Sequence, residues 1–211
     1  MDDFLGLPAN DRRDACETAA TRTRLPAVSI EKDFWVCWTL RELFALPEIG
    51  AHLTFKGGTS LSKAWGLIER FSEDIDVVID RDALGFGGER SPEHAPSRKK
   101  QRQWLDELRA ASQTRIRESL HPALVARIAE KLPPGTDWRL ESDPEDPDAQ
   151  TLLFSYPTVF GEGSYVTPRV KIELGARSDT DPADMPEIEP YLAGVFPEIM
   201  SQAHVLGIVD D

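Results

Sequence analysis

The chain has 211 residues, of which 40% are hydrophobic and 29% charged, and this composition is typical of a globular protein and not of a disordered tail. Its length fits one large domain, or one domain with a small annex. Acidic residues (37) outnumber basic ones (24), and the net charge of −13 argues against a protein that coats nucleic acid, although it does not forbid a local basic site.

Membrane insertion, secretion and disulfide bonding are not expected. No apolar run approaches the roughly 18–20 residues that a membrane-spanning helix needs. The N-terminus, Met1–Phe4, is acidic where a signal peptide would be basic. Two cysteines, Cys16 and Cys37, provide neither a disulfide framework nor a zinc cluster. We therefore expect a cytoplasmic protein with reduced thiols.

Two helices are expected near the N-terminus. Residues 11–23 favour a short polar helix that ends before Pro26. Ser29 is the expected N-cap of a second helix, which runs from Ile30 to about Ala45. Apolar residues cover more than one face of this second helix, so we expect it to be buried on most sides, with its tryptophans in the core.

A strand, a glycine turn, a helix and a second strand are expected next. Leu53–Lys56 alternates as a short strand does, and Gly57-Gly58 turns the chain. The helix then extends to about Ile68. Asp74–Ile79 predicts the second strand, because it is rich in β-branched residues.

Beyond this unit the chain alternates between loops, helices and strands. Residues 80–97 are loop-like. The pattern from Arg98 to about Leu132 is helical, and we expect two pieces that part at Pro122. Residues 141–148 form an acidic loop interrupted by prolines.

Leu152–Tyr156 and Tyr165–Leu174 predict two strands that pair as a hairpin. These elements favour an α/β (α+β) fold, with a small mixed β-sheet flanked by helices. We predict N-terminal helices at 1–50 that pack on the core, a core at 51–177 with a helical insertion at about 98–132, and at 178–211 a linker that starts a C-terminal region.

The first site-like feature is a pair of acids, Asp74 and Asp76, at the start of a strand. Side chains two residues apart on a strand point to the same face, so the two carboxylates repel each other. A divalent cation would relieve this repulsion, and hard oxygen ligands suit Mg²⁺. The alternative is a solvated strand face that carries two acids. Val77–Ile79 favours the metal site, because this strand enters a core.

The second feature is the turn Gly57-Gly58-Thr59-Ser60, which precedes a predicted helix. Glycines let the backbone approach a phosphate, and the start of a helix offers free N–H groups. The turn lacks the spacing of a Walker loop or of a dinucleotide-binding motif. One intervening helix can bring the turn and the two acids to the same end of a sheet.

These features together resemble the DNA polymerase beta-like nucleotidyltransferases, and among them the AbiEii/AbiGii toxin family. The resemblance is carried by Phe55-Lys-Gly-Gly-Thr-Ser-Leu-Ser-Lys63, by Arg70-Phe-Ser-Glu-Asp-Ile-Asp76 and by Ile30-Glu-Lys-Asp-Phe-Trp35. Residues 25–80 match well, and Val170-Lys-Ile-Glu-Leu174 fits the next element of the family.

The resemblance implies transfer of a nucleoside monophosphate from an NTP to an acceptor, with two Mg²⁺ ions. Asp74 and Asp76 would be catalytic residues that hold both ions. A third carboxylate on a neighbouring strand commonly completes the site in this fold, and Glu173 is our candidate for that catalytic and metal-binding role. Strand alternation puts Glu173 and Lys171 on one face, so the alternative is a surface ion pair between them.

The resemblance also implies a set of nucleotide-binding residues. The turn would cradle the β- and γ-phosphates, and Lys63 or Lys56 would neutralise phosphate charge unless both are ordinary surface lysines. Ser72 would bind a phosphate or cap the turn. The expected nucleotide-binding residues are Gly57, Gly58, Thr59, Ser60, Lys63 and Ser72.

Several family members are RNA-modifying toxins, so the expected acceptor is tRNA or another RNA, and a cognate antitoxin is an expected partner. A basic helical region near Trp104 is either an RNA-binding surface or a solvated helix with internal ion pairs. Its basic residues are Arg98, Lys99, Lys100, Arg102, Arg109, Arg115 and Arg117.

Family members continue past the point where this sequence stops, with a helical region that supplies a further Lys and Asp to the nucleotide site. Nothing after Arg177 matches that pattern, so we expect the C-terminal helical part to be missing here. The alternative to an active toxin is an inactive or truncated remnant that binds an NTP, an RNA or a protein partner. A nucleotidyltransferase acting on a small molecule is a further alternative.

Overall fold

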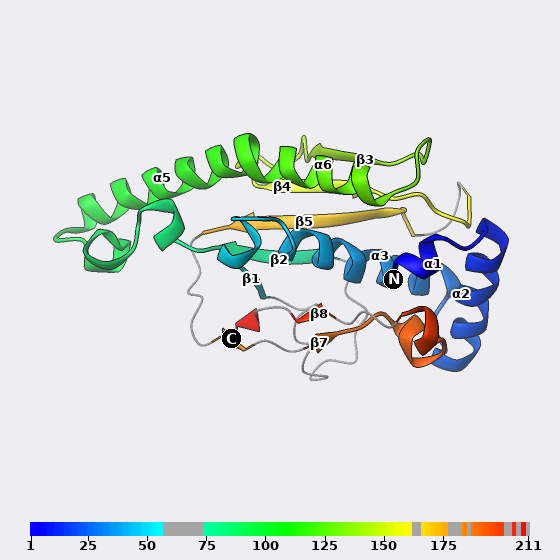
Figure 1. The fold of residues 1–211 in the computed structure, drawn as a ribbon. Helices are drawn as coiled ribbons and strands as arrows, with labels where there is room; N and C mark the ends of the chain where they lie inside the picture. Colours follow the sequence, from blue (N-terminus) through cyan, green and yellow to red (C-terminus); the bar gives the residue numbers. More distant parts are fainter. Residues whose placement is uncertain are drawn as a thin grey trace.

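A mixed β-sheet forms the centre of the computed structural model, which describes residues 1–56, 74–161, 166–176, 183–184, 187–200, 204–205 and 208–209. Five strands lie in the order β3-β4-β5-β2-β1 (Figure 1). They are β1 (Leu53–Lys56), β2 (Asp74–Ile79), β3 (Arg139–Ser142), β4 (Thr151–Ser155) and β5 (Arg169–Gly175). Strands β2 and β5 run parallel, and the other neighbours in this group are antiparallel. The expected small mixed sheet with flanking helices is confirmed.

Short strands from the C-terminal region extend the sheet beyond β1. Strand β9 (Ile208–Val209) pairs parallel with β1, and β6 (Ala183–Asp184) pairs antiparallel with β9. A separate antiparallel pair consists of β7 (Glu187–Ile188) and β8 (His204–Val205). The part of the chain that was expected to be a linker therefore contributes backbone pairing to the core sheet.

The hairpin expected from the sequence is confirmed, because β4 and β5 pair antiparallel. Strand β5 begins at Arg169, so the start expected at Tyr165 was too early: residues 166–168 are described and are not strand, and Pro168 has no N–H to donate to a neighbouring strand. Strand β3 was not expected. It has four residues, of which Leu140 alone is buried, so its sequence carries almost no alternation. Pairing with β4 makes it a strand.

Helix α3 (Ala27–Phe44) is the buried helix of the fold, and every residue from Ser29 to Leu43 is buried. This confirms the expectation of burial on most sides. The helix starts before the predicted Ser29 cap, because the carbonyl of Pro26 accepts hydrogen bonds from the N–H groups of Ser29 and Ile30. Proline suits a helix start, since it has no N–H to leave unpaired.

Two tryptophans of α3 pack on β4 and on the segment that follows it. Trp35 stacks on Tyr156 with ring centroids 5.3 Å apart, and Trp38 stacks on Phe154 at 5.8 Å. Both tryptophans are essentially inaccessible, so they belong to the core as expected.

Buried ion pairs attach two other helices to α3. Within α3, Arg41 Nε lies 2.5 Å from Glu42 Oε1, and Arg41 also pairs with Asp2 of α1 (Asp2–Leu5). Arg127 of α6 (His121–Lys131) donates from Nε to the second oxygen of Glu42 at 2.7 Å. Helix α2 (Ala9–Thr23) packs alongside α3 and confirms the predicted polar helix.

The predicted helical insertion is confirmed, but its break lies elsewhere. Helix α5 (Arg98–Arg115) leads into α6 through a π-helical turn, η5 (Ile116–Leu120), and Pro122 lies in the first turn of α6. Proline is tolerated there because the first N–H groups of a helix have no partner within it. Helix α5 extends past the strands at one end of the molecule, opposite α1 and α2 (Figure 1). The described 3₁₀ turns are η1 (Gly50–His52), η2 (Asp82–Leu84), η3 (Gly88–Arg90), η4 (Pro92–His94), η6 (Tyr191–Gly194) and η7 (Pro197–Ile199).

Candidate active site

Acidic side chains from β2 and β5 lie next to each other on one face of the sheet. The parallel register places Asp76 opposite Glu173 and Asp74 opposite Lys171. Alternate residues of both strands, such as Ile75 and Ile172, are buried on the other face. The same alternation that packs the core therefore presents these charged side chains together, although they are about 100 residues apart in the sequence.

The side chains of Asp76 and Glu173 lie next to each other, and both residues are partly buried. Burial raises the pKa of Asp76 to about 6, and the neighbouring Glu173 carboxylate adds to this rise. The positive charge of Lys56, which lies opposite Asp76 on β1, acts against it. Two ionised carboxylates this close together repel each other, and a cation would relieve the repulsion.

Glu173 also pairs with Lys171 on its own strand, with Lys171 Nζ 2.5 Å from Glu173 Oε1. The surface pair considered from the sequence is therefore present, together with the contact to Asp76. The hydrogen bond to Glu173 raises the pKa of Lys171, and the charges of Glu173, Asp74 and Asp143 act in the same direction. Lys171 thus holds one carboxylate of the pair and faces two further acids.

These residues fit a magnesium site in part. Magnesium usually takes one or two protein carboxylates and leaves its other positions to water and to substrate phosphates. Asp76 and Glu173 supply such a pair. Asp74 lies on the same face but is exposed at the start of β2. Among the described residues, no three His, Cys, Asp or Glu side chains converge closely enough to hold an ion.

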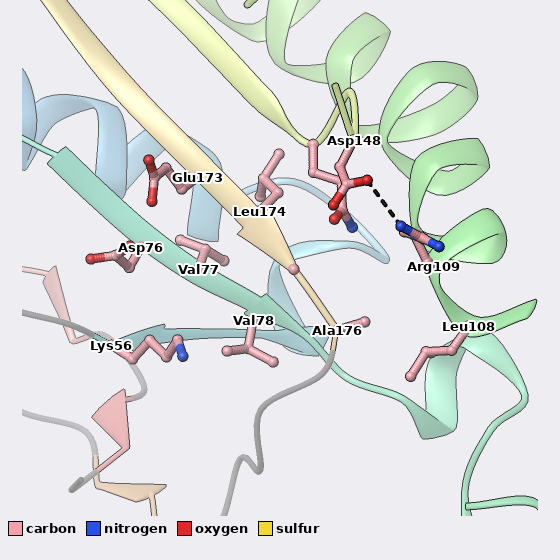
Figure 2. A pocket seen from close by; sticks show the side chains of 12 residues that line it. Lys56, Asp76, Val77, Val78, Leu108, Arg109, Asp148, Glu173, Leu174 and Ala176 are labelled. Carbon is pink, nitrogen blue, oxygen red and sulfur yellow. Dashed lines mark hydrogen bonds and ion pairs between the residues drawn. The ribbon is translucent and has the colours of Figure 1, made fainter. Parts of the chain in front are cut away.

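A cavity of about 260 Å³ opens beside the acid pair. Figure 2 shows Asp76 and Glu173 on one side of it and Arg109 and Asp148 on the other, with the dashed line joining the last two. It is lined by Lys56, Asp76, Val77, Val78, Leu108, Arg109, Asp148, Gln150, Glu173, Leu174, Gly175 and Ala176. The cavity therefore lies between the ends of β2 and β5, α5 and the β3–β4 loop.

The sequence did not single out Asp148 and Gln150 of this lining, because they belong to the loop between β3 and β4. Asp146 organises this loop: its two carboxylate oxygens accept hydrogen bonds from the N–H groups of Asp148 and Gln150, both at 2.8 Å. The aspartates of this loop could have suggested such a turn. No sequence signal indicated that the turn faces the acids.

A second hollow lies at the other end of the acids, next to Asp74. Its lining includes the cationic side chains of Lys32, Arg169 and Lys171. Lys32 belongs to the segment Ile30–Trp35 that carries part of the family resemblance, and it is buried. The acids Asp74, Asp143 and Glu145 share the same lining.

The predicted phosphate-binding residues lie outside the described part of the chain. These are Gly57, Gly58, Thr59, Ser60, Lys63 and Ser72. Lys56, the residue directly before the glycine turn in sequence, is the last residue of β1 and lines the cavity. Of the two lysines predicted to neutralise phosphate charge, Lys56 therefore lines the cavity, and Lys63 lies outside the described residues.

A comparison with protein-family models identifies the family of the chain. The family model described as "Nucleotidyl transferase AbiEii toxin, Type IV TA system" matches residues 38–204. The search of the curated proteins returned no match. Among solved structures, MenT4, a nucleotidyltransferase toxin from Mycobacterium tuberculosis H37Rv, aligns with a TM-score of 0.44 and 15% identity. The alignment covers 93% of this chain and 55% of MenT4, so the chain spans about half the length of that toxin.

None of the described helices is both long enough and apolar enough to cross a membrane.

Proposed function

Because the chain belongs to the AbiEii family of nucleotidyltransferase toxins from type IV toxin–antitoxin systems, we propose that it transfers a nucleoside monophosphate from an NTP to an RNA acceptor. The observation that carries this proposal is the pairing of Asp76 with Glu173 across two parallel strands at the wall of a cavity. Two neighbouring acids on a partly buried sheet face disfavour the folded state, whereas a site for divalent cations uses such carboxylates as ligands.

In the proposed reaction, an acceptor hydroxyl oxygen forms a bond to the α-phosphorus of the NTP. The bond from that phosphorus to the bridging oxygen breaks, pyrophosphate leaves, and the hydroxyl proton passes to a base. Two Mg²⁺ ions, when bound, would stabilise the charge on the attacking and leaving oxygens. Asp76 and Glu173 would hold them, and Asp74 would join from the same strand face.

Other residues of the site would act on the charge of the substrate. Lys56 reaches the cavity beside Asp76 and would offset the phosphate charge. Lys171 holds the Glu173 carboxylate at 2.5 Å and so keeps it beside Asp76 until a substrate binds. The described part of the site thus provides acids for metal ions and a lysine for phosphate.

The basic side chains of α5 support an RNA acceptor, here proposed to be tRNA. Arg109 of α5 pairs with Asp148, and Arg117 of the η5 turn that follows pairs with Glu118. At the start of the helix the situation differs, because Arg98, Lys99 and Arg102 are exposed and make no ion pair within the described residues. Positive charges in the first turn reduce the stability of a helix, because the helix dipole is positive at that end. The presence of these cations therefore indicates a role in binding an anionic ligand and not in stabilising the helix.

By the same family membership, we propose that the protein acts in the cytoplasm, inhibits growth and is neutralised by a cognate antitoxin. The alternative is a protein that binds NTP or RNA without transfer. Growth inhibition by such a protein would persist when Asp76 is replaced, whereas growth inhibition by an active enzyme would be lost.

The proposal is tested by incubating the purified chain with total tRNA, Mg²⁺ and each of the four NTPs labelled on the α-phosphate. We expect label in RNA with at least one NTP, and none with Asp76→Asn or Glu173→Gln. Asp137→Asn, an exposed acid in the loop before β3, is the matched control and should label RNA as the wild type does. No labelling above the Asp76→Asn background, with any NTP, would refute transfer to tRNA.

A further inference from the structure

The apolar part of the cavity lining has the composition of a site for a neutral ring. Its buried lining residues include Val78, Leu108, Leu174 and Ala176, each at most 4% exposed. The charged side chains of the whole lining are Lys56, Arg109, Asp76, Glu173 and Asp148, so acids outnumber cations. Away from the metal-binding acids, Arg109 and Asp148 are paired with each other, so this part of the lining has little net charge and accepts an uncharged group.

The size of the cavity agrees with this composition. Pockets for drug-sized ligands usually have volumes of roughly 300–1,000 Å³. At about 260 Å³, this cavity is smaller than that range and fits a part of a nucleotide. The part that is both flat and uncharged is the nucleobase.

Polar groups converge on the same end of the cavity, and their positions are held by hydrogen bonds. Arg109 donates from Nη1 to Asp148 Oδ1 at 3.1 Å and from Nη2 to Asp106 Oδ1 at 2.9 Å. These bonds use two of the five N–H groups of the guanidinium, which leaves three to donate. The two bonds therefore orient the plane of the Arg109 guanidinium, and its other N–H groups remain available to a ligand (Figure 2).

Gln150 is held from three sides. Its side-chain amide donates to Ser112 Oγ of α5 at 3.0 Å, its backbone N–H donates to Asp146 at 2.8 Å, and its carbonyl accepts from the N–H of Leu174 at 2.9 Å. The side-chain oxygen remains as an acceptor. Gln113 of α5 adds a bond of 2.6 Å to the carbonyl of Asp148. The loop, α5 and β5 thus form one connected wall.

We infer that this wall is the nucleobase subsite of the proposed nucleotidyltransferase, and that Arg109, Asp148 and Gln150 select which NTP is used. The apolar residues would pack against the base, and the guanidinium, carboxylate and amide would read the donors and acceptors on its edge. Such groups discriminate between bases, because a mismatched base leaves a donor or an acceptor without a partner. This inference rests on the proposed function.

The test is calorimetric binding of ATP, GTP, CTP, UTP and inorganic tripolyphosphate to the full chain, with Mg²⁺ and without RNA. Asp148→Asn is the informative variant. Asparagine keeps an oxygen that accepts from Arg109 and replaces the other oxygen with a donor, so the wall should survive while its hydrogen-bond pattern changes. We expect the order of the four NTP affinities to change, with at least one affinity altered roughly tenfold, and tripolyphosphate binding to stay constant.

Gln150→Leu provides a second variant, which removes the acceptor and should reduce the preference among the four NTPs. Asp137→Asn and Gln101→Leu, both exposed and outside the cavity lining, are the matched controls. The thermal midpoint of each variant shows whether it folds. Uniform weakening of all four NTPs together with tripolyphosphate would assign these residues to phosphate binding and overturn the inference.

The outcomes separate the two proposals. If the wild type binds NTPs but both variants keep its order of affinities, the nucleobase subsite is wrong and the proposed function stands. If the wild type binds no NTP and labels no RNA, the proposed function fails and the subsite fails with it.

Discussion

Replacing Asp76 with Asn should stabilise the metal-free protein while it abolishes transfer. In the folded chain, burial and the Glu173 carboxylate raise the pKa of Asp76 from its ordinary value of 3.8 to about 6. Each unit of such a rise corresponds to about 1.4 kcal/mol of lost stability, so the ceiling is about 3 kcal/mol at neutral pH. Asp76 is half-buried, and water screens part of this penalty, so we expect a gain of about 1–2 kcal/mol.

The pH dependence of the gain identifies its cause. Below pH 3.8 the carboxyl group is protonated in both the folded and the unfolded chain, and Asp76 then carries no penalty. Between about pH 4 and pH 6 the unfolded chain releases the proton and the folded chain keeps it, so wild-type stability falls as the pH rises. The advantage of Asp76→Asn should therefore be small at pH 4.5 and complete at pH 7.5.

Urea unfolding in EDTA, followed by tryptophan fluorescence, measures this difference. The control Asp137→Asn should change the free energy of unfolding by less than about 0.5 kcal/mol at both pH values. Adding Mg²⁺ should stabilise the wild type more than Asp76→Asn, because an ion that binds the folded state alone shifts the unfolding equilibrium. A gain that is absent at pH 7.5, or equal at both pH values, would refute the electrostatic reasoning.

Three further changes test the packing and the buried charges. Phe154→Ala should destabilise the fold by about 3–5 kcal/mol in urea unfolding, because it leaves a cavity under Trp38; a loss below 1 kcal/mol would contradict the packing. Glu42→Gln should lower the free energy of unfolding by about 3–5 kcal/mol, because it leaves the buried Arg41 without one of its partner charges. Glu118→Gln, which removes an exposed ion pair, should lower it by less than about 1 kcal/mol. Burial raises the pKa of Cys16 to about 12, so a thiol reagent at pH 8 should modify Cys16 only after unfolding; rapid modification of the native protein would show that this helix opens.

The stabilisation expected from Asp76→Asn is also informative about function. A sequence selected for stability alone would not place two carboxyl groups side by side on a partly buried sheet face. Proteins keep such unfavourable arrangements where a ligand or a reaction requires them. The two changes, a gain in stability and a loss of activity, are therefore expected from one substitution.

Much of the local structure and part of the site were predictable from the sequence by itself. Alternation and β-branched residues located β1 and β2, and apolar residues around all sides of α3 indicated its burial. The spacing of Asp74 and Asp76 placed them on one strand face, and the alternation in β5 placed Glu173 with Lys171. These predictions succeeded because strand and helix periodicities are local properties of the chain.

The tertiary structure decided which of these residues meet. The parallel register of β2 and β5 sets Asp76 opposite Glu173, and a shift of one residue would turn every side chain of β5 to the other face. The hydrogen bonds of Arg109 and Gln150 likewise depend on how α5 lies against the β3–β4 loop. Contacts between segments so distant in sequence leave no periodic signal, because they follow from how the whole core packs. The sequence therefore determined the family and the acids, and the fold determined the cavity beside them.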